Sequence, residues 1–273
     1  MLGDVRWADW DQARPGFVEI ELVGHEGGDN NGDFASSLTV TDIATGWTEV
    51  HSVRNKAARH VFCALVEIQA GLPFPLLGID SDNGSEFIND HLLRWCTSQR
   101  ITFTRSGEQN DGCHVEQKNW DIARRTVGYW RYDTPSEVAL LNQIWAALSP
   151  LMNLFTPQQK LLTETRVGAK VTRTYDTGQT PYQRLLGHPE ALDDLDARRL
   201  ATQLEATNPA AVRRQVGQLR ATLLERVRRK RSPPEPKPPT STDPKPRSTR
   251  GRSSRHLWMS QRIEPAGQVD MSQ

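Results

Sequence analysis

Three strand-like runs follow one another near the start of the chain, and they constrain its fold more than any other feature. Residues 15–24, PGFVEIELVG, alternate apolar and polar side chains after a Pro-Gly start, which is typical of a strand. Residues 36–53, SSLTVTDIATGWTEVHSV, contain two more such runs around a tight turn at Ala44–Gly46. The first fifth of the chain therefore predicts three consecutive strands.

Helical and strand-like segments alternate after these strands. Residues 55–73 carry apolar side chains at helical spacing, with a glycine and a proline where a helix ends. The run LLGID, from residue 76, predicts the next strand. Ser85 is placed to cap a helix that runs to about Arg100, and residues 101–105 predict a short strand.

Two longer helices come next. One is predicted from about Cys113 to Tyr132, behind a polar loop. Thr134 and Glu137 have the spacing of a capping box, which predicts a helix ending near Pro150. Strands and helices in this order predict an α/β architecture, in which helices pack on a mixed sheet.

The C-terminal part of the chain is less regular. Residues 156–190 are basic and predicted irregular, apart from a helical turn at TPYQRLL, and two helical segments follow at 192–205 and 209–230. From Ser232 onward the chain is rich in Pro and Ser and too polar to build a core, which predicts disorder. The chain therefore divides into a core, an extension and a tail: 1–155, 156–231 and 232–273.

Charge is unevenly distributed along the chain. From Arg226 onward there are 12 basic and four acidic side chains, which leaves 22 basic and 29 acidic side chains before that residue. A basic, flexible end on an acidic body suggests a polyanion as partner.

Cysteine usage and hydropathy bear on the compartment. Cys63, Cys96 and Cys113 show no paired spacing, which argues against a disulfide scaffold and for a reducing compartment. No apolar stretch approaches the roughly 20 residues that a membrane span needs, and no signal peptide follows Met1. We therefore expect a soluble, cytoplasmic protein with no membrane partner.

Three carboxylates stand where packing can bring them together at an edge of the sheet. Asp82 comes just past the strand that starts at residue 76, and Asp80 shares its face. Glu116 lies in the first turn of a helix behind a flexible loop. Glu21 lies near the centre of the first strand, on the same face as Glu19.

Such carboxylates repel one another, and hard divalent cations relieve the repulsion. Two Mg²⁺ ions (or Mn²⁺) about 4 Å apart can activate a nucleophilic oxygen and stabilise the leaving oxygen at a phosphodiester. The pattern therefore favours a two-metal phosphodiester site made by Glu21, Asp82 and Glu116.

Two motifs carry a resemblance to a known family. SDNGSEF at 81–87, followed by NDGCHVEQKNW at 110–120, resembles the signature of the retroviral-integrase-type transposases, the integrase catalytic core of bacterial insertion sequences. Members use an Asp–Asp–Glu triad. Asp82 matches the second position and Glu116, 34 positions further on, the third; Glu21 stands at the first. The resemblance covers roughly residues 7–186.

The resemblance implies a ribonuclease-H-like fold, with a mixed five-stranded sheet flanked by helices. It implies metal-dependent DNA cleavage followed by strand transfer, with two Mg²⁺ ions held by Glu21, Asp82 and Glu116. The implied partners are DNA, as element ends and target, and further copies of the chain on that DNA. The implied location is the bacterial cytoplasm, at the nucleoid when the protein is bound to DNA.

Basic and polar residues beside Glu116 are candidate contacts to the DNA backbone, because such groups position phosphates. The alternative for them is a solvated helix face. The residues are Lys118, Asn119, Arg124 and Arg125. Just after the first strand, His25 is considered as a supporting residue.

Two departures from the family pattern keep other interpretations open. Glu21 stands where the family has aspartate, and misplacing a carboxylate by about 1 Å can cost about 10²-fold in rate. The family's core usually follows a helix-turn-helix region, whereas this chain begins almost at the core. One alternative is therefore a truncated, catalytically impaired remnant that only binds DNA or a partner, and another is a ribonuclease-H-like nuclease. If these residues have only structural roles, Asp82 forms an Asx turn and Glu116 complements the dipole of its helix.

Overall fold

The computed structural model of the 273-residue chain describes residues 10–81, 84, 86–87, 89–105 and 119–231. Contacts between residues divide the chain into two units, 1–233 and 234–273, and every described residue belongs to the first. The tail from residue 232 lies outside the described residues, and the domain boundaries at 155 and 231 stay predictions.

A mixed five-stranded sheet forms the centre of the first unit, in the order β3-β2-β1-β4-β5. β1 pairs antiparallel with β2, and β2 with β3, whereas β4 runs parallel to both β1 and β5. This order, with these directions, is that of the ribonuclease-H-like fold, so the predicted fold class is confirmed. The strands, all five of them expected from the sequence, are β1 (Phe17–Gly24), β2 (Ser36–Asp42), β3 (Thr48–Val53), β4 (Gly78–Ser81) and β5 (Thr102–Arg105).

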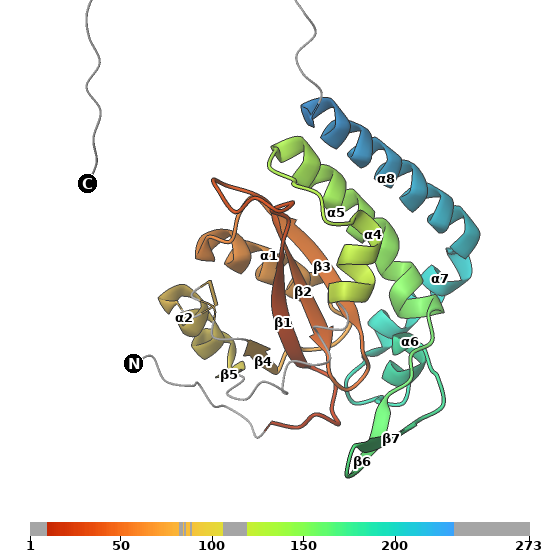
Figure 1. The fold of residues 1–273 in the computed structure, drawn as a ribbon. Coiled ribbons are helices and arrows are strands. Elements are labelled where there is room, and N and C mark those ends of the chain that lie inside the picture. The colour runs from red at the N-terminus through yellow and green to blue at the C-terminus, as the bar shows by residue number, and fades with distance from the viewer. Residues whose placement is uncertain (1–9, 82–83, 85, 88, 106–118, 232–273) are drawn as a thin grey trace, which may run out of the picture. The chain divides into compact units, whose positions relative to one another are not determined.

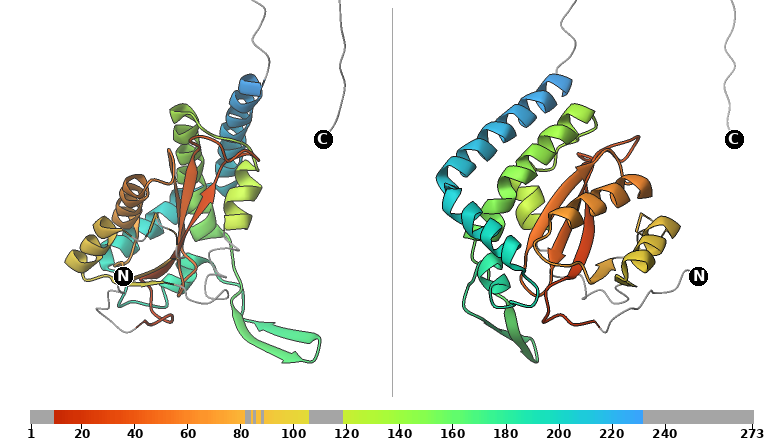
Figure 2. Two further views of the ribbon diagram at one scale, coloured as in Figure 1. Left: turned by 60° about the vertical axis from the view of Figure 1, so that its left-hand side comes forward. Right: turned by 180° about the vertical axis from the view of Figure 1, so that it is seen from behind.

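Helices cover both faces of this sheet (Figure 1). In Figure 2, left, the sheet is seen nearly edge-on between the two helical layers. One layer consists of α1 (Ala58–Gly71) and α2 (Asp90–Gln99). The opposite layer contains the π-helical segment η1 (Asn119–Arg124), α4 (Arg125–Val127), α5 (Pro135–Pro150) and α8 (Pro209–Arg231).

The remaining elements link α5 to α8. They are the π-helical segment η2 (Leu151–Phe155), the strands β6 (Leu161–Val167) and β7 (Lys170–Tyr175), and the helices α6 (Pro181–Leu185) and α7 (Asp194–Ala206). α6, α7 and α8 confirm the helices predicted in this part of the chain. β6 and β7 form a hairpin of their own, so the prediction of an irregular segment at 156–190 is wrong.

The main hydrophobic core lies between the sheet and α1. Alternate residues of a strand point to one face, and on this face they are aliphatic. The buried strand residues are Val18, Ile20, Leu38, Val40 and Ile79, and they pack with Val61, Ala64, Leu65 and Ile68 of α1. Burial of this apolar surface is the main stabilising contribution to the fold.

α5 begins where the sequence predicts. Thr134 and Glu137 form the expected capping box, in which each side chain accepts a hydrogen bond from the other's backbone N–H. With η2 it makes a 21-residue segment, Pro135–Phe155, and within the described part of the chain this segment alone is long and apolar enough to cross a membrane. The expectation that no apolar stretch approaches that length is therefore wrong. Ile144 and Trp145 are buried in a second core formed with β3 and α8.

Two asparagines of this segment cover the outer edge of β3. Asn153 Oδ1 accepts from Thr48 N at 2.9 Å, and Asn153 Nδ2 donates to Thr48 O at 2.9 Å. Asn142 makes the same pair of bonds with Ser52, at 2.6 and 3.0 Å. The side-chain amides thus satisfy backbone groups that a neighbouring strand would otherwise satisfy.

Two predicted helix boundaries are wrong. α2 begins at Asp90 because Asn89 caps it, with its side chain accepting from His91 N and Leu92 N; Ser85 lies outside the described residues. The helix predicted to reach Tyr132 ends at Val127, and a glycine with φ of 75° follows it.

Candidate active site

A row of polar side chains, buried except for the half-buried Thr104, crosses the sheet on the face opposite α1. Direct pairing places these residues side by side, one from each strand from β3 to β5: Thr48, Thr41, Glu19, Asp80 and Thr104. Glu19 is 4% exposed and Asp80 9%. Buried polar groups are costly unless they are hydrogen-bonded, so a polar row through the middle of a sheet marks a candidate functional site.

Hydrogen bonds hold the two ends of this polar row. Thr104 Oγ1 donates to Asp80 Oδ1 at 2.9 Å, and the hydroxyls of Thr41 and Thr48 lie 3.2 Å apart. At its centre, Glu19 and Asp80 are directly paired on neighbouring parallel strands, whose spacing is about 4.8 Å. Carboxylates at such a spacing repel unless a proton or a cation lies near them.

Glu21 lies one row further along the same face. It is half-buried and pairs with Thr39 of β2; the Thr39 hydroxyl is buried and has no hydrogen-bond partner among the described residues. The last pair between β1 and β4 is Ile20 with Ser81. Glu21 follows the first of these residues in the sequence, and the second predicted carboxylate follows the other.

Two of the three predicted metal ligands, Asp82 and Glu116, lie outside the described residues, so the triad stays a prediction. Within the described residues no group of three or more His, Cys, Asp and Glu side chains could hold a metal ion. The donors next to Glu21 are nevertheless carboxylate and hydroxyl oxygens, which Mg²⁺ and Mn²⁺ prefer. The chemistry of this face therefore fits a hard divalent cation.

The predicted DNA-contacting residues are described only in part. Lys118 and the side chain of Asn119 lie outside the described residues. Arg124 has a side chain only 17% exposed, and its guanidinium lies 3.9 Å from the carboxylate of Glu26. Arg125 is exposed. Contacts between these residues and DNA stay a prediction.

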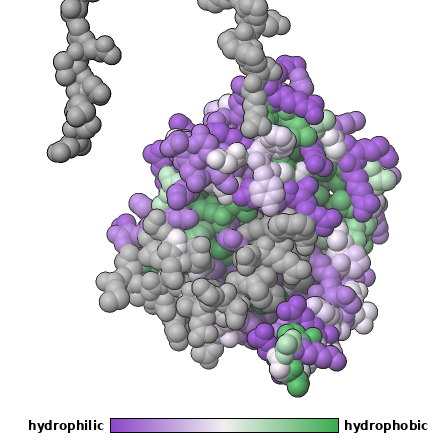
Figure 3. Space-filling view, in the orientation of Figure 1, coloured by the Kyte–Doolittle hydropathy of each residue, from purple (hydrophilic) through white to green (hydrophobic). Residues whose placement is uncertain are grey.

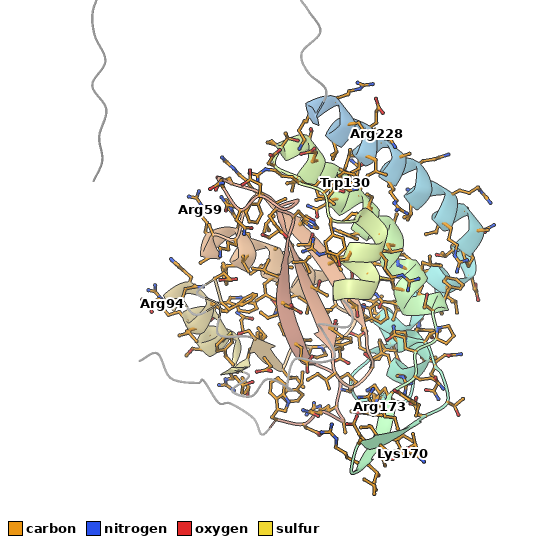
Figure 4. The ribbon with its side chains drawn as sticks, in the orientation of Figure 1. Arg59, Arg94, Trp130, Lys170, Arg173 and Arg228 are labelled. Atoms are coloured by element: carbon orange, nitrogen blue, oxygen red, sulfur yellow. The ribbon has the colours of Figure 1, made fainter. Side chains whose placement is uncertain are left out.

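Two aromatic side chains lie on the surface just after α4. Tyr129 is 62% exposed and Trp130 39%, and the Arg124 guanidinium lies 4.7 Å from the centre of the Tyr129 ring. Figure 4 shows Trp130 between α5 and the C-terminal end of α8. Trp145 of α5, in contrast, is packed in the core and only 2% exposed.

A buried hydrogen-bond chain lies beyond the end of β1. His25 Nε2 is 2.7 Å from Ser37 Oγ, which is 2.7 Å from Ser52 Oγ, and Trp145 Nε1 donates to Ser52 Oγ at 2.7 Å. Burial, and then the positive charge of Arg124, lower the pKa of His25 to about 3. The imidazole is therefore neutral at pH 7, and it ties the three antiparallel strands to α5.

Sequence reasoning did not find that Glu19 and Asp80 are partners. The spacing by two within each strand, Glu19 with Glu21 and Asp80 with Asp82, placed each pair on one face. Which residue of β1 faces which residue of β4 depends on the register between two strands more than 50 residues apart, and no local pattern encodes it.

The sheet and its polar face define the class: a ribonuclease-H-like domain with carboxylates on its central strands. No protein-family model matches the chain. The chain is similar to an uncharacterised protein, y4rM, of Sinorhizobium fredii, at 41% identity over 180 residues, which is 65% of this chain and 51% of that protein. It thus spans about half the length of this curated relative.

Three solved structures to which the chain is similar are retroviral. The catalytic core of the HTLV-2 integrase in complex with magnesium has a TM-score of 0.43 and 15% identity, covering 63% of this chain and 98% of that one. The catalytic core of the BIV integrase has a TM-score of 0.43 and 17% identity, covering 63% and 94%. A simian T-cell lymphotropic virus intasome chain has a TM-score of 0.42 and 14% identity, covering 65% and 72%.

Proposed function

We propose that the chain is an integrase-type DNA transposase, a polynucleotidyl transferase that cleaves DNA and joins the freed 3′ end to target DNA. The observation that carries the proposal is the register of the central strands. Glu21 and Asp82 each directly follow a residue of the last β1–β4 pair, Ile20 with Ser81. The proposed setting is the bacterial cytoplasm, with several copies assembled on DNA.

In this proposal Glu21, Asp82 and Glu116 hold two Mg²⁺ or Mn²⁺ ions. Bound there, such ions would activate the attacking oxygen and stabilise the leaving oxygen of a phosphodiester. The chain's own contribution is positioning: the hydrogen bond from Thr104 to Asp80 and the pairing of β1 with β4 fix the strands that carry the first two ligands.

A nicking assay on supercoiled plasmid DNA tests the proposal. We expect the full chain to nick the plasmid with Mg²⁺ or Mn²⁺, and Asp82→Asn and Glu116→Gln to abolish this activity. Glu205→Gln, on the exposed surface of α7, is the matched control and should nick as the wild type does. Nicking by either site variant would refute the triad.

Metal binding gives a second readout that needs no turnover. Ions that bind only the folded state raise its melting temperature, by an amount set by their concentration relative to the dissociation constant. Mn²⁺ should therefore raise the melting temperature of the wild type and of Glu205→Gln more than that of Asp82→Asn. Cleavage confined to an RNA–DNA hybrid would favour the nuclease alternative, and DNA binding with no cleavage would favour the binding-only one.

A further inference from the structure

The hairpin β6–β7 stands away from the rest of the unit. Figures 1 and 2 show it projecting beyond the helices below the sheet. Every residue of both strands is exposed, so the hairpin buries almost nothing against the body. A two-stranded hairpin of this kind is only marginally stable on its own, and its persistence as a projecting element calls for an explanation.

The base of the hairpin is firmly held, unlike its tip. Lys160 Nζ donates to the carbonyl oxygens of Ile43 and Ala44, in the turn between β2 and β3. Lys160 N donates to Asp176 Oδ1 at 2.6 Å, and Asp176 forms an ion pair with Arg184 at 2.7 Å. These bonds fix where the hairpin leaves the sheet, so the arm has a defined position relative to the polar face.

The side chains of the hairpin suit a polyanion. Arg166, Lys170 and Arg173 outnumber the one acid, Glu164, whose carboxylate lies 2.7 Å from Arg173 Nε. Within the described residues, neither Arg166 nor Lys170 forms an ion pair. Between the charges, one face carries four threonines in two cross-strand pairs, Thr163 with Thr174 and Thr165 with Thr172, whose hydroxyls can bond to phosphates and base edges.

Apolar side chains are also exposed on the hairpin, but they are divided between its base (Leu161, Leu162 and Tyr175) and its tip (Val167 and Val171). Leu161 and Tyr175 pair at its base. Val167, 74% exposed, and Val171, 39% exposed, belong to adjacent cross-strand pairs and therefore point to opposite faces. Figure 3 shows hydrophobic and hydrophilic residues next to one another in this region. The hairpin thus lacks the large contiguous apolar patch that marks many protein-binding surfaces, and its excess of basic side chains favours a polyanion as partner.

We propose that β6–β7 is an arm that binds duplex DNA. The major groove, about 12 Å wide, admits a two-stranded ribbon, and the strands of this one lie about 4.8 Å apart. The threonine face, which also carries Lys170, turns towards the base edges, and Lys170 contacts a phosphate beside it. Arg166, on the opposite face next to the turn, contacts a phosphate at the edge of the groove. The choice of DNA as the polyanion rests on the proposed function.

The test measures the affinity of the full chain for a labelled duplex by fluorescence anisotropy, with EDTA present so that no cleavage occurs. The variant Arg166→Gln/Lys170→Gln should weaken binding about tenfold at 0.1 M salt and reduce the slope of log K against log salt by about 2, one unit for each lost phosphate contact. The Arg173–Glu164 pair is left intact.

Arg59→Gln/Arg94→Gln is the matched control. It removes the same charge from exposed positions on α1 and α2, on the side of the unit away from the hairpin (Figure 4), and should change affinity less than about twofold. The single variant Lys170→Glu gives a second test and should weaken binding further than the loss of one charge does. Unchanged melting temperatures verify that all variants fold.

Equal affinities of the hairpin and control variants would overturn the proposal. So would a hairpin variant that binds DNA normally but changes from oligomer to monomer in light scattering, because the partner of the arm would then be a second copy. DNA binding that depends on the hairpin, in a chain that cleaves nothing, would support the arm and refute the transposase, so the two failures are distinguishable.

Discussion

The two faces of the central sheet differ in what their burial contributes. Towards α1, β1 and β4 present Val18, Ile20 and Ile79, which contribute by apolar packing alone. Towards the other side, the same strands present Glu19 and Asp80, which are also buried and are directly paired across the two strands. Neighbouring residues of one strand therefore have different roles: one face packs the apolar core, and the other buries carboxyl groups, whose burial is costly unless they are hydrogen-bonded or paired.

The largest expected effect sets Ile79 against its neighbour Asp80. Ile79→Ala should lower the free energy of unfolding by about 2–5 kcal/mol, because it leaves a cavity in the core. Asp80→Asn keeps the side-chain volume and removes one of two adjacent charges, so stability should stay within about 1 kcal/mol of the wild type or rise. Urea unfolding measures both, and equal losses would show that the polar face is part of the core.

The next effect concerns rate. Glu21→Asp shortens the side chain by one methylene and should raise divalent-dependent cleavage by up to about 10²-fold, if the extra length displaces the carboxylate by about 1 Å. The melting temperature should hardly change, since Glu21 is only half-buried. Nicking rates with Mn²⁺ measure the gain. A lower rate would mean that the strand has adjusted to glutamate, and equal rates that this position is not geometrically critical.

A third effect appears in the pH dependence of stability. The pKa of His25 is lowered to about 3 in the folded protein, from 6.5, so the unfolded chain binds the proton more readily. Stability is therefore unaffected by this group above pH 6.5 and falls as the pH drops towards 3, by at most about 1.4 kcal/mol per pH unit.

Urea unfolding at pH 7.5, 6.5 and 5.5 checks this effect, with His25→Gln as the comparison. Between pH 6.5 and 5.5 the free energy of unfolding of the variant should fall less than that of the wild type, even if the variant is less stable at every pH. The pKa of His51 is also lowered by burial, and it contributes equally to both proteins. Identical slopes would show that folding does not lower the pKa of His25.

The smallest effect concerns the hydrogen bond at one end of the polar row. Thr104→Val removes the hydroxyl that donates to Asp80 at 2.9 Å and should cost about 1 kcal/mol, whereas Thr104→Ser, which keeps the donor, should cost less. Thermal melts of the two variants measure the difference. A valine variant as stable as the serine one would mean that Asp80 does not depend on this bond.

Much of the fold could be predicted because elements with one buried face repeat their apolar residues at a regular spacing in the sequence. The strands of the sheet and α1 alternate or repeat their apolar residues, and each was found. The strands of the hairpin β6–β7 show no such spacing of apolar residues, because all their residues are exposed. Its signals were the β-branched residues and Gly168, whose φ is 62°, which together favour strands and a turn but say nothing of burial.

The candidate site could be predicted only as separate pieces. Motifs along the chain identified Asp82 and Glu116, and alternation placed Glu21 on a face with Glu19. The row from Thr48 to Thr104 could not be predicted, because it depends on the registers of four strand pairs at once. Register follows from the packing of whole strands, which single positions do not reveal.

The asparagine pairs on β3 have a consequence for how copies of this chain can join. A sheet grows when a strand from another molecule adds to an open edge, whether in a specific complex or in a fibril. At Thr48 and Ser52 the incoming strand would have to displace four hydrogen bonds that the chain makes with itself. Self-association through strand addition is thereby directed away from β3, and copies that assemble at that side of the sheet must meet through side chains.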